Sequence, residues 1–294
     1  MWFIYVILGS LFSSAYYFGN QVAKIKPHIF MFYRGIVPAV AMFPLVLWVE
    51  PVANWQFYVF CTLQGCVISF IDYRNFRAMR VWGAEAVSAL HPLSIGVVFL
   101  LWLLIKPYIL LNYMDNLWKF SGILLALTGV IYATFSFGKA RNSRKLLYYM
   151  VPYFFGAATV DVINKVCMSY AGASQLKAAS IFYIMITGLV VAVVNFTIFK
   201  NKTNKINELF NKNNLKYSPI ILLLIGFMTC KNFAMFNVSN PAFVMATLYI
   251  YILWIMLVGQ IKQIRQKLGS YRHIEYKKAF ILLFSAIVLV LLEN

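Results

Sequence analysis

Arg74-Asn75-Phe76 and Lys231-Asn232-Phe233 are two copies of one short pattern, 157 positions apart (74 to 231) in a chain of 294 residues. In each copy a valine follows seven residues after the basic residue, and a similar apolar stretch comes next. An earlier pair of segments, Asn20-Gln21-Val22 and Asn164-Lys165-Val166, repeats in the same order. The chain therefore contains two related units of about half its length. Paired repeats of apolar helices are typical of membrane transporters, whose substrate site lies where the repeats meet.

The composition predicts an all-α integral membrane protein. The chain is 62% hydrophobic and 12% charged, with a mean hydropathy of +0.76, whereas soluble domains are about 45–50% apolar and about 25% charged. The net charge of +18 would suggest a nucleic-acid partner in a soluble protein. Because the basic residues lie between apolar segments, we interpret them as topology signals and contacts with anionic lipids, and we expect no nucleic-acid partner.

The apolar segments predict ten transmembrane helices, each near the roughly 20 residues that a bilayer requires. The first is expected to be a retained span, because the N-terminus lacks the basic region and cleavage site of a signal peptide. We expect the spans at 2–21, 29–49, 57–78, 84–105, 118–137, 146–168, 178–199, 217–237, 242–261 and 277–292.

Basic residues are distributed very unequally among the predicted loops. The odd-numbered loops hold 20 lysines and arginines, and the even-numbered loops hold three, Lys106, Lys119 and Lys177. Since cytoplasmic loops carry the excess of Lys and Arg, both termini are expected outside the cytoplasm, in a multi-pass protein of the cell (inner) membrane. Five spans per copy is an odd number, so the two repeats, 1–138 and 146–294, are expected to be inverted relative to each other.

Charged side chains inside the spans are candidates for a substrate site, because each costs about 2.5–3.5 kcal/mol in a bilayer and usually faces the protein interior. Asp161, Asn164 and Lys165 share one helix face through their i, i+3, i+4 spacing. They form either a substrate or proton site or a structural ion pair within the helix. Lys231-Asn232 lies well inside another span with no acid nearby in the sequence, so Asp161 is its expected partner across helices.

A second polar group lies toward the odd-loop side of the first repeat. It is expected either to contact the substrate directly or to form a structural network, which could act as a gate. The match between Arg74 and Lys231 favours substrate binding by Arg74. Its members are Arg34, Asp72, Arg74 and Glu85.

His91-Pro92 lies inside the fourth predicted span. The proline frees a backbone carbonyl, which allows a bend or an oxygen that accepts an ion. His91 either carries protons or is a packed residue. Aromatic side chains either line a cavity, where they would stack on an organic cation or a base, or pack against lipid and neighbouring helices. They are Tyr16, Tyr17, Tyr249, Tyr251 and Trp254.

Enzyme chemistry finds little support in the sequence. None of the HExxH, GxSxG, P-loop or GxGxxG motifs occurs. The three histidines have no metal-binding spacing, and the four cysteines show no CxxC pair. We therefore expect no catalytic residue, no metal and no cofactor.

Several short motifs give the chain a resemblance to a known family. They are Ser13-Ser14-Ala15, Phe32-Tyr33-Arg34, the tight turn Val81-Trp82-Gly83-Ala84, Ser121-Gly122-Ile123 and Asp161-Val162-Ile163-Asn164-Lys165. Together with the five-plus-five arrangement, they resemble the EamA type of the drug/metabolite transporter superfamily, and the last motif is similar to that of S-adenosylmethionine uptake carriers of intracellular bacteria. The resemblance implies secondary transport by alternating access. It also implies a cavity between the two halves, with Arg34, Asp161, Asn164 and Lys165 as site residues, and cytoplasmic termini, in contrast to the charge count.

Three functions remain open. The first is a carrier for a small zwitterion, such as an amino-acid derivative or the nucleoside-containing S-adenosylmethionine. The second is a carrier for anionic or phosphorylated solutes, with Arg34, Arg74 and Lys231 as the anion clamp. The third is a membrane scaffold that transports nothing. Expected partners are a small-molecule substrate, the lipid bilayer and a proton or exchanged solute, for a monomer or homodimer. The charged wall of a single site is expected mainly from the second repeat.

Overall fold

The computed structural model describes residues 2–22, 26–138, 144–202, 209, 217–255, 257–258 and 276–293, and these residues form helices without any β-strand. The helices are α1 Trp2–Val22, α2 Pro27–Val46, α3 Trp55–Trp82, α4 Ala84–Ser88, α5 Leu93–Ile105, α6 Pro107–Met114, α7 Leu117–Gly138, α8 Arg144–Ala171, α9 Leu176–Lys202, α11 Ser218–Phe236, α12 Pro241–Leu248 and α14 Tyr276–Glu293.

Many of these helices are long and apolar enough to cross a bilayer. Within the described ranges six segments meet that requirement, and two shorter apolar helices cover Trp2–Tyr17 and Pro241–Ile255. The six are Ile29–Val46, Ala86–Ile105, Leu117–Ser136, Arg144–Ala171, Leu176–Lys200 and Ser218–Phe236. The outer surface carries large apolar side chains, such as Leu104 and Leu125 at 78% and 74% exposure. Both features are those of a multi-pass membrane protein.

Helix ends follow from local sequence. Pro27 opens α2 at a position where its missing N–H would have no partner in any case. At the start of α3 the side chain of Asn54 accepts a hydrogen bond from the backbone N–H of Gln56 at 3.0 Å. Gly83 ends α3 with a positive φ of 89°, which suits a residue without a Cβ and confirms the expected tight turn.

The predicted span 84–105 is interrupted in the structure. Between α4 and α5 the backbone forms tighter i to i−3 hydrogen bonds, including Leu93 N to Leu90 O and Ile95 N to Pro92 O. Pro92 has no N–H to donate, so the interruption follows directly from the sequence. A similar turn with Ile250 N bonded to Thr247 O follows α12, where there is no proline. The sequence also left 106–117 as a loop, whereas much of it forms the short helix α6.

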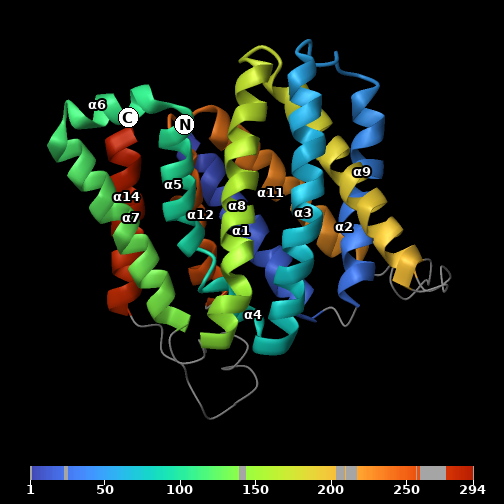
Figure 1. Cartoon of the computed structure of the whole chain (residues 1–294), viewed down its shortest axis with the longest axis horizontal. Helices are drawn as coiled ribbons and strands as arrows, with labels where there is room; N and C mark the ends of the chain where they lie inside the picture. Colours follow the sequence, from blue (N-terminus) through green and yellow to red (C-terminus); the bar gives the residue numbers. More distant parts are fainter. Residues whose placement is uncertain are drawn as a thin grey trace.

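The closest helix pairs join segments that are far apart in sequence. The most extensive contacts are α2 with α9, α1 with α11, α3 with α8, and α7 with α14. Figure 1 shows these helices side by side in one bundle, with both termini and α6 at the same end. We call this end the terminal face.

Small residues allow α2 and α9 to cross closely. A Cβ atom on Gly35 would collide with the backbone of Gly188 and Ala192. A Cβ atom on Gly188 would lie 2.8 Å from the carbonyl oxygen of Gly35 and 3.3 Å from the backbone nitrogen of Ala39. Each helix therefore supplies a small-xxx-small pair, the pattern by which membrane helices bring their backbones together.

Candidate functional site

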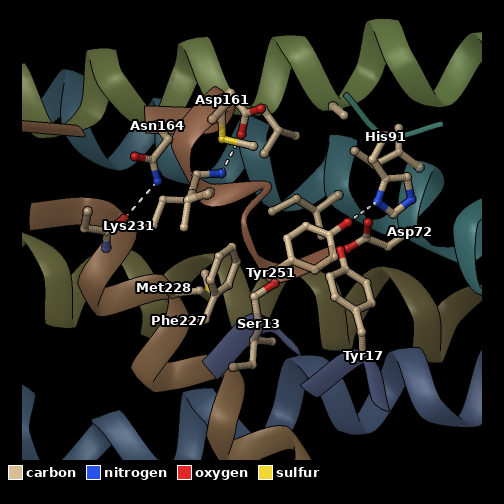
Figure 2. Close-up of a pocket in the computed structure, with 18 of the residues that line it drawn as sticks. Ser13, Tyr17, Asp72, His91, Asp161, Asn164, Phe227, Met228, Lys231 and Tyr251 are labelled. Carbon is tan, nitrogen blue, oxygen red and sulfur yellow. Dashed lines mark hydrogen bonds and ion pairs between the residues drawn. The ribbon is translucent and has the colours of Figure 1, made fainter. Parts of the chain in front are cut away.

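A cavity of about 120 Å³ lies among α1, α2, α3, α8, α9, α11, α12 and the two interrupted segments. Four charged residues and several tyrosines line it, with apolar side chains between them. Figure 2 shows polar and aromatic side chains pointing toward one another from several helices. We call this the central cavity.

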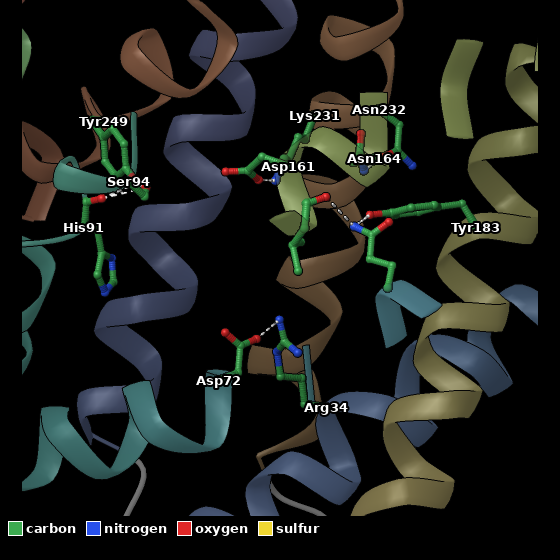
Figure 3. A network of polar contacts seen from close by, with 12 residues as sticks. Arg34, Asp72, His91, Ser94, Asp161, Asn164, Tyr183, Lys231, Asn232 and Tyr249 are labelled. Carbon is green, nitrogen blue, oxygen red and sulfur yellow. Dashed lines mark hydrogen bonds and ion pairs between the residues drawn. The ribbon is translucent and has the colours of Figure 1, made fainter. Parts of the chain in front are cut away.

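The first ion pair of the central cavity joins α8 to α11. Lys231 Nζ lies 2.5 Å from Asp161 Oδ1, and their side chains are 10% and 4% exposed. The pair is drawn in Figures 2 and 3. It is the partnership expected from the sequence, where Lys231 has no acid on its own helix. Pairing lowers the cost of burying each charge away from water.

The second ion pair joins α2 to α3. Arg34 Nη2 contacts Asp72 Oδ2, and each side chain is 13% exposed. Figure 3 shows this pair at a different level from Lys231 and Asp161. Arg34 lies near the beginning of α2, so its pair is the one further from the terminal face. The central cavity thus has one ion pair toward each end.

Buried amides connect α8, α9 and α11. Asn164 Nδ2 donates to Asn232 Oδ1 at 2.8 Å, and Asn232 Nδ2 donates to Ser180 Oγ at 3.0 Å. Asn232 is fully buried. The Oδ1 atom of Asn164 is buried and has no hydrogen-bond partner among the described residues. An acceptor of this kind, on a residue that lines the cavity, is available to a donor group of a ligand.

Gln64 extends the polar wall from α3. Its Nε2 atom donates to the carbonyl oxygen of Val160 at 3.1 Å and also contacts the hydroxyl of Tyr183. Gln64 is fully buried, and these contacts satisfy its Nε2 donors, which would otherwise be costly to bury, whereas its Oε1 has no hydrogen-bond partner among the described residues. They hold Tyr183, which lines the central cavity, in place.

His91 contacts several tyrosines that form an aromatic wall of the central cavity. Its Nδ1 lies 3.0 Å from the Tyr251 hydroxyl, and its Nε2 lies 2.9 Å from Asn75 Oδ1. Tyr17 stacks on Tyr251 with ring centroids 5.2 Å apart, and Tyr153 lies 4.9 Å from the His91 ring. Such faces can bind an organic cation or stack on a planar ring.

The structure brings together most of the predicted site residues. Those that line the central cavity are Arg34, Asp72, His91, Asp161, Asn164, Lys231 and Asn232. Of the five aromatic candidates, Tyr17, Tyr249 and Tyr251 also line it. The side chain of Glu85 lies outside the part of the chain that the structure describes.

Two predicted site residues are directed elsewhere. Arg74 donates from Nε to the carbonyl oxygen of Tyr149 at 2.6 Å, and its guanidinium lies 4.4 Å from the centre of the Tyr149 ring. Lys165 donates to the carbonyl oxygens of Met235 and Phe236 at 2.8 and 3.3 Å. These carbonyls belong to the last turn of α11, where backbone oxygens lack helical partners and attract a cation. The suggested pair of Lys165 with Asp161 is therefore wrong.

The charged residues that line the central cavity come equally from the two halves of the chain, and not mainly from the second. Arg34 and Asp72 come from the first half of the chain, and Asp161 and Lys231 come from the second. The repeated segments Asn20-Gln21-Val22 and Asn164-Lys165-Val166 lie on α1 and α8. The charges of the first half lie instead on α2 and α3.

Sequence reasoning missed Gln64, Tyr153, Ser180 and Tyr183. Tyr153 had a usable signal, because it lies eight residues before Asp161 on α8, about two helical turns away on the same face. Ser180 and Tyr183 lie on α9, whose apolar segment contains no charged residue, so no signal in the sequence marks a site there. Within the described residues no group of three or more His, Cys, Asp or Glu side chains could hold a metal ion.

No family model matches the chain, and no curated protein matches it at a significant level.

Proposed function

We propose that the chain is a secondary transporter that binds a small zwitterionic organic solute in the central cavity, between two inverted five-helix repeats. The observation that carries this proposal is the pair of buried ion pairs, Arg34 with Asp72 and Lys231 with Asp161, around one cavity. Buried charges in a membrane protein usually mark the pathway of a substrate or ion.

The pattern of helix contacts supports the two inverted repeats. Exchanging the halves replaces α1, α2, α3 and α7 by α8, α9, α11 and α14. The pairs α2–α9 and α7–α14 are unchanged by this exchange, and α1–α11 becomes α8–α3. The four most extensive helix contacts therefore map onto one another, as a pseudo-two-fold axis would require.

The interrupted segments support the same arrangement in finer detail. The hydrogen bonds Leu93 to Leu90 and Ile250 to Thr247 have distances of 3.1 and 3.1 Å, and their residues are 157 positions apart (93 to 250). This separation is the one between Arg74 and Lys231. Both interruptions adjoin the central cavity, and substrate sites of inverted-repeat transporters typically lie beside such discontinuous helices.

The charge balance of the central cavity favours a zwitterion. Its two acidic and two basic residues cancel, and each charge already has an opposite partner. A zwitterion can exchange with such pairs without adding net charge to a membrane interior. The tyrosines and His91 would hold an aromatic or cationic portion of the solute. The alternative of an anion clamp has less support, because Arg74 faces α8 and both other basic residues are paired.

Uptake into proteoliposomes tests the proposal. We expect the purified full-length chain to take up a radiolabelled zwitterion from a panel of amino acids and S-adenosylmethionine. Asp161→Asn and Lys231→Met should each reduce that uptake at least about tenfold, since one lost charged contact typically contributes more than 1.4 kcal/mol. Arg74→Gln is the control, because it removes a charge outside the cavity.

The outcomes separate the three functions. Uptake of zwitterions that fails only in the cavity variants supports the proposal. Uptake of phosphorylated or other anions, with zwitterions rejected, would favour the anion carrier. If no class of solute is taken up, and if the protein folds normally with each of the three substitutions, the chain is a scaffold.

A further inference from the structure

A second hollow lies at the terminal face, beside α6. It has a volume of about 450 Å³ and is formed by α5, α6, α7, α8, the segment after α11 and the end of α14. Three lysines line it, Lys106, Lys119 and Lys165, together with the carboxylate of Glu293. Among the described residues it shares no lining residue with the central cavity. We call it the terminal hollow.

The protein neutralises only part of the positive charge of the terminal hollow, which is lined by three lysines and one carboxylate. Glu293 accepts hydrogen bonds from the backbone N–H and the hydroxyl of Ser239, the latter at 2.8 Å. Lys165 is 7% exposed, and its partners are the two backbone carbonyls at the end of α11. In the part of the chain that the structure describes, none of the three lysines forms an ion pair. Three ammonium groups thus face one hollow with a single carboxylate, so basic groups outnumber acidic ones three to one.

The location of these lysines is unusual for this chain. Basic residues are rare in the even-numbered loops, where only Lys106, Lys119 and Lys177 occur among 26 lysines and arginines. Two of these three line the terminal hollow. A role as topology signals does not explain them, because basic residues on this side weaken the bias set by the opposite side.

The surroundings suit a phosphate group at the membrane boundary. Asn112, Tyr113 and Ser169 contribute polar side chains to the hollow. On α6, Tyr108 and Leu111 are 56% and 62% exposed, which is typical of a short helix that lies along a membrane interface. The lysines therefore lie near the level at which lipid phosphates are found.

We propose that the terminal hollow binds a phosphate-bearing anion through Lys106, Lys119 and Lys165. Lysine binds phosphate as a point charge, and several ammonium groups around one anion suit its multiple oxygen atoms. The anion is either the headgroup of an acidic phospholipid or a small soluble phosphoester. This site is separate from the proposed transport site and does not depend on that function.

Thermal unfolding of the purified full-length chain in a neutral detergent provides the test. The lipid arm adds dioleoylphosphatidylglycerol, with dioleoylphosphatidylcholine as the uncharged control, and the soluble arm adds glycerol 3-phosphate. We expect a saturable rise in Tm with at least one of the two anions and none with phosphatidylcholine, since a ligand stabilises the state that it binds. The double substitution K106Q/K119Q should weaken the apparent affinity at least about tenfold, because each lysine near an anionic surface adds severalfold.

Lys177→Gln is the matched control, since Lys177 is an exposed lysine of the same side that does not line the hollow. Lys119→Gln alone replaces the double variant if the latter fails to fold. Stabilisation by phosphatidylglycerol alone identifies a lipid site, and competition by glycerol 3-phosphate identifies a soluble ligand. The proposal is overturned if neither anion stabilises the chain or if the lysine variants bind the anion as tightly as the unmodified chain. It is also overturned if Lys177→Gln lowers the affinity for the anion as much as K106Q/K119Q does.

Discussion

At the scale of single residues, the pair of Lys231 and Asp161 gives a prediction about stability. Both side chains are almost fully buried, so Asp161→Asn leaves an ammonium group without its partner. Breaking a buried pair by removing one member typically costs about 3–5 kcal/mol. The double variant Asp161→Asn/Lys231→Met should be clearly more stable than Asp161→Asn alone, because no unpaired charge remains.

Unfolding in detergent, followed by circular dichroism, measures this difference. Uptake should be lost in the single and the double variant alike, which separates the effect on transport from the effect on stability. If the double variant were no more stable than Asp161→Asn, the pair would not be the reason that these residues tolerate burial.

The same pair shows what single residues reveal in sequence. A lysine within an apolar segment, with no acid on its helix, requires a partner from elsewhere, and Asp161 was correctly identified. Lys165 was assigned incorrectly, because i, i+4 spacing allows a pair without requiring one. Its actual partners are backbone carbonyls of another helix end, and no feature of the sequence marks which helix end packs against α8.

At the scale of helices, the crossing of α2 and α9 depends on the absence of a side chain. A Cβ atom on Gly188 would lie 2.8 Å from the Gly35 carbonyl oxygen, which is backbone and cannot rotate away. We therefore expect Gly188→Ala to destabilise the chain by roughly 1–3 kcal/mol or more, the usual cost of overpacking. The Tm of the purified protein measures it.

Gly96 provides the control for this substitution. It also lies in a helix, but a Cβ atom there would meet nothing within 4 Å. Gly96→Ala should leave the Tm unchanged or raise it, because alanine is favoured over glycine in helices by roughly 0.5–1 kcal/mol. Equal Tm values for Gly188→Ala and Gly96→Ala would show that α2 and α9 can move apart without loss of stability.

The interruption between α4 and α5 leads to a prediction about Tyr249. Its hydroxyl donates to the carbonyl oxygen of His91 at 3.0 Å and lies 3.2 Å from Ser94 Oγ. Tyr249→Phe should cost about 1 kcal/mol in unfolding free energy, the usual net value of one hydrogen bond. It should also reduce uptake, because it loosens the turn beside the central cavity.

Tyr132→Phe serves as the comparison, since Tyr132 is 59% exposed on the outer surface. It should match the unmodified protein in both Tm and uptake. If Tyr249→Phe also matches the unmodified protein, the contact between the two interrupted segments has no part in the function.

Helix positions were largely accessible from sequence, but helix interruptions were not. The apolar segments and the turn at Gly83 follow from composition and from one glycine. Pro92 marked one interruption. The second, at Ile250, has no proline and lies where Tyr17 of the first half stacks on Tyr251 of the second, a contact that is not visible in the sequence.

At the scale of the whole molecule, the site is assembled from residues that no single segment reveals. Arg34 and Asp72 lie on different helices of the first half, and α3, which carries Asp72, packs on α8, which carries Asp161 of the other pair. The two copies of the repeated motif lie on α3 and α11. However, Arg74 and Lys231 have different partners. Arg74 donates to the carbonyl oxygen of Tyr149, whereas Lys231 pairs with Asp161.

The final prediction concerns how the molecule lies in the membrane. Both termini lie at one end, and the odd-numbered loops, with 20 basic residues against three, are expected at the other. Basic residues near the ends of spans are retained in the cytoplasm, so the terminal face is expected to be extracytoplasmic. The family that the sequence resembles predicts the opposite. Asn116, between α6 and α7, and Arg144, at the start of α8, are exposed residues of the two ends, so each can carry a single cysteine as a probe.

A membrane-impermeant maleimide applied to intact cells should label Asn116→Cys, whereas Arg144→Cys should react only after the membrane is permeabilised. The unmodified chain is the blank, since its cysteines are buried or half-buried. A reporter that is active only outside the cytoplasm, fused after Asn294, should also give a signal. Labelling in the reverse pattern would contradict the charge count. It would place the 20 basic residues of the odd-numbered loops outside the cytoplasm, where no retention mechanism accounts for them.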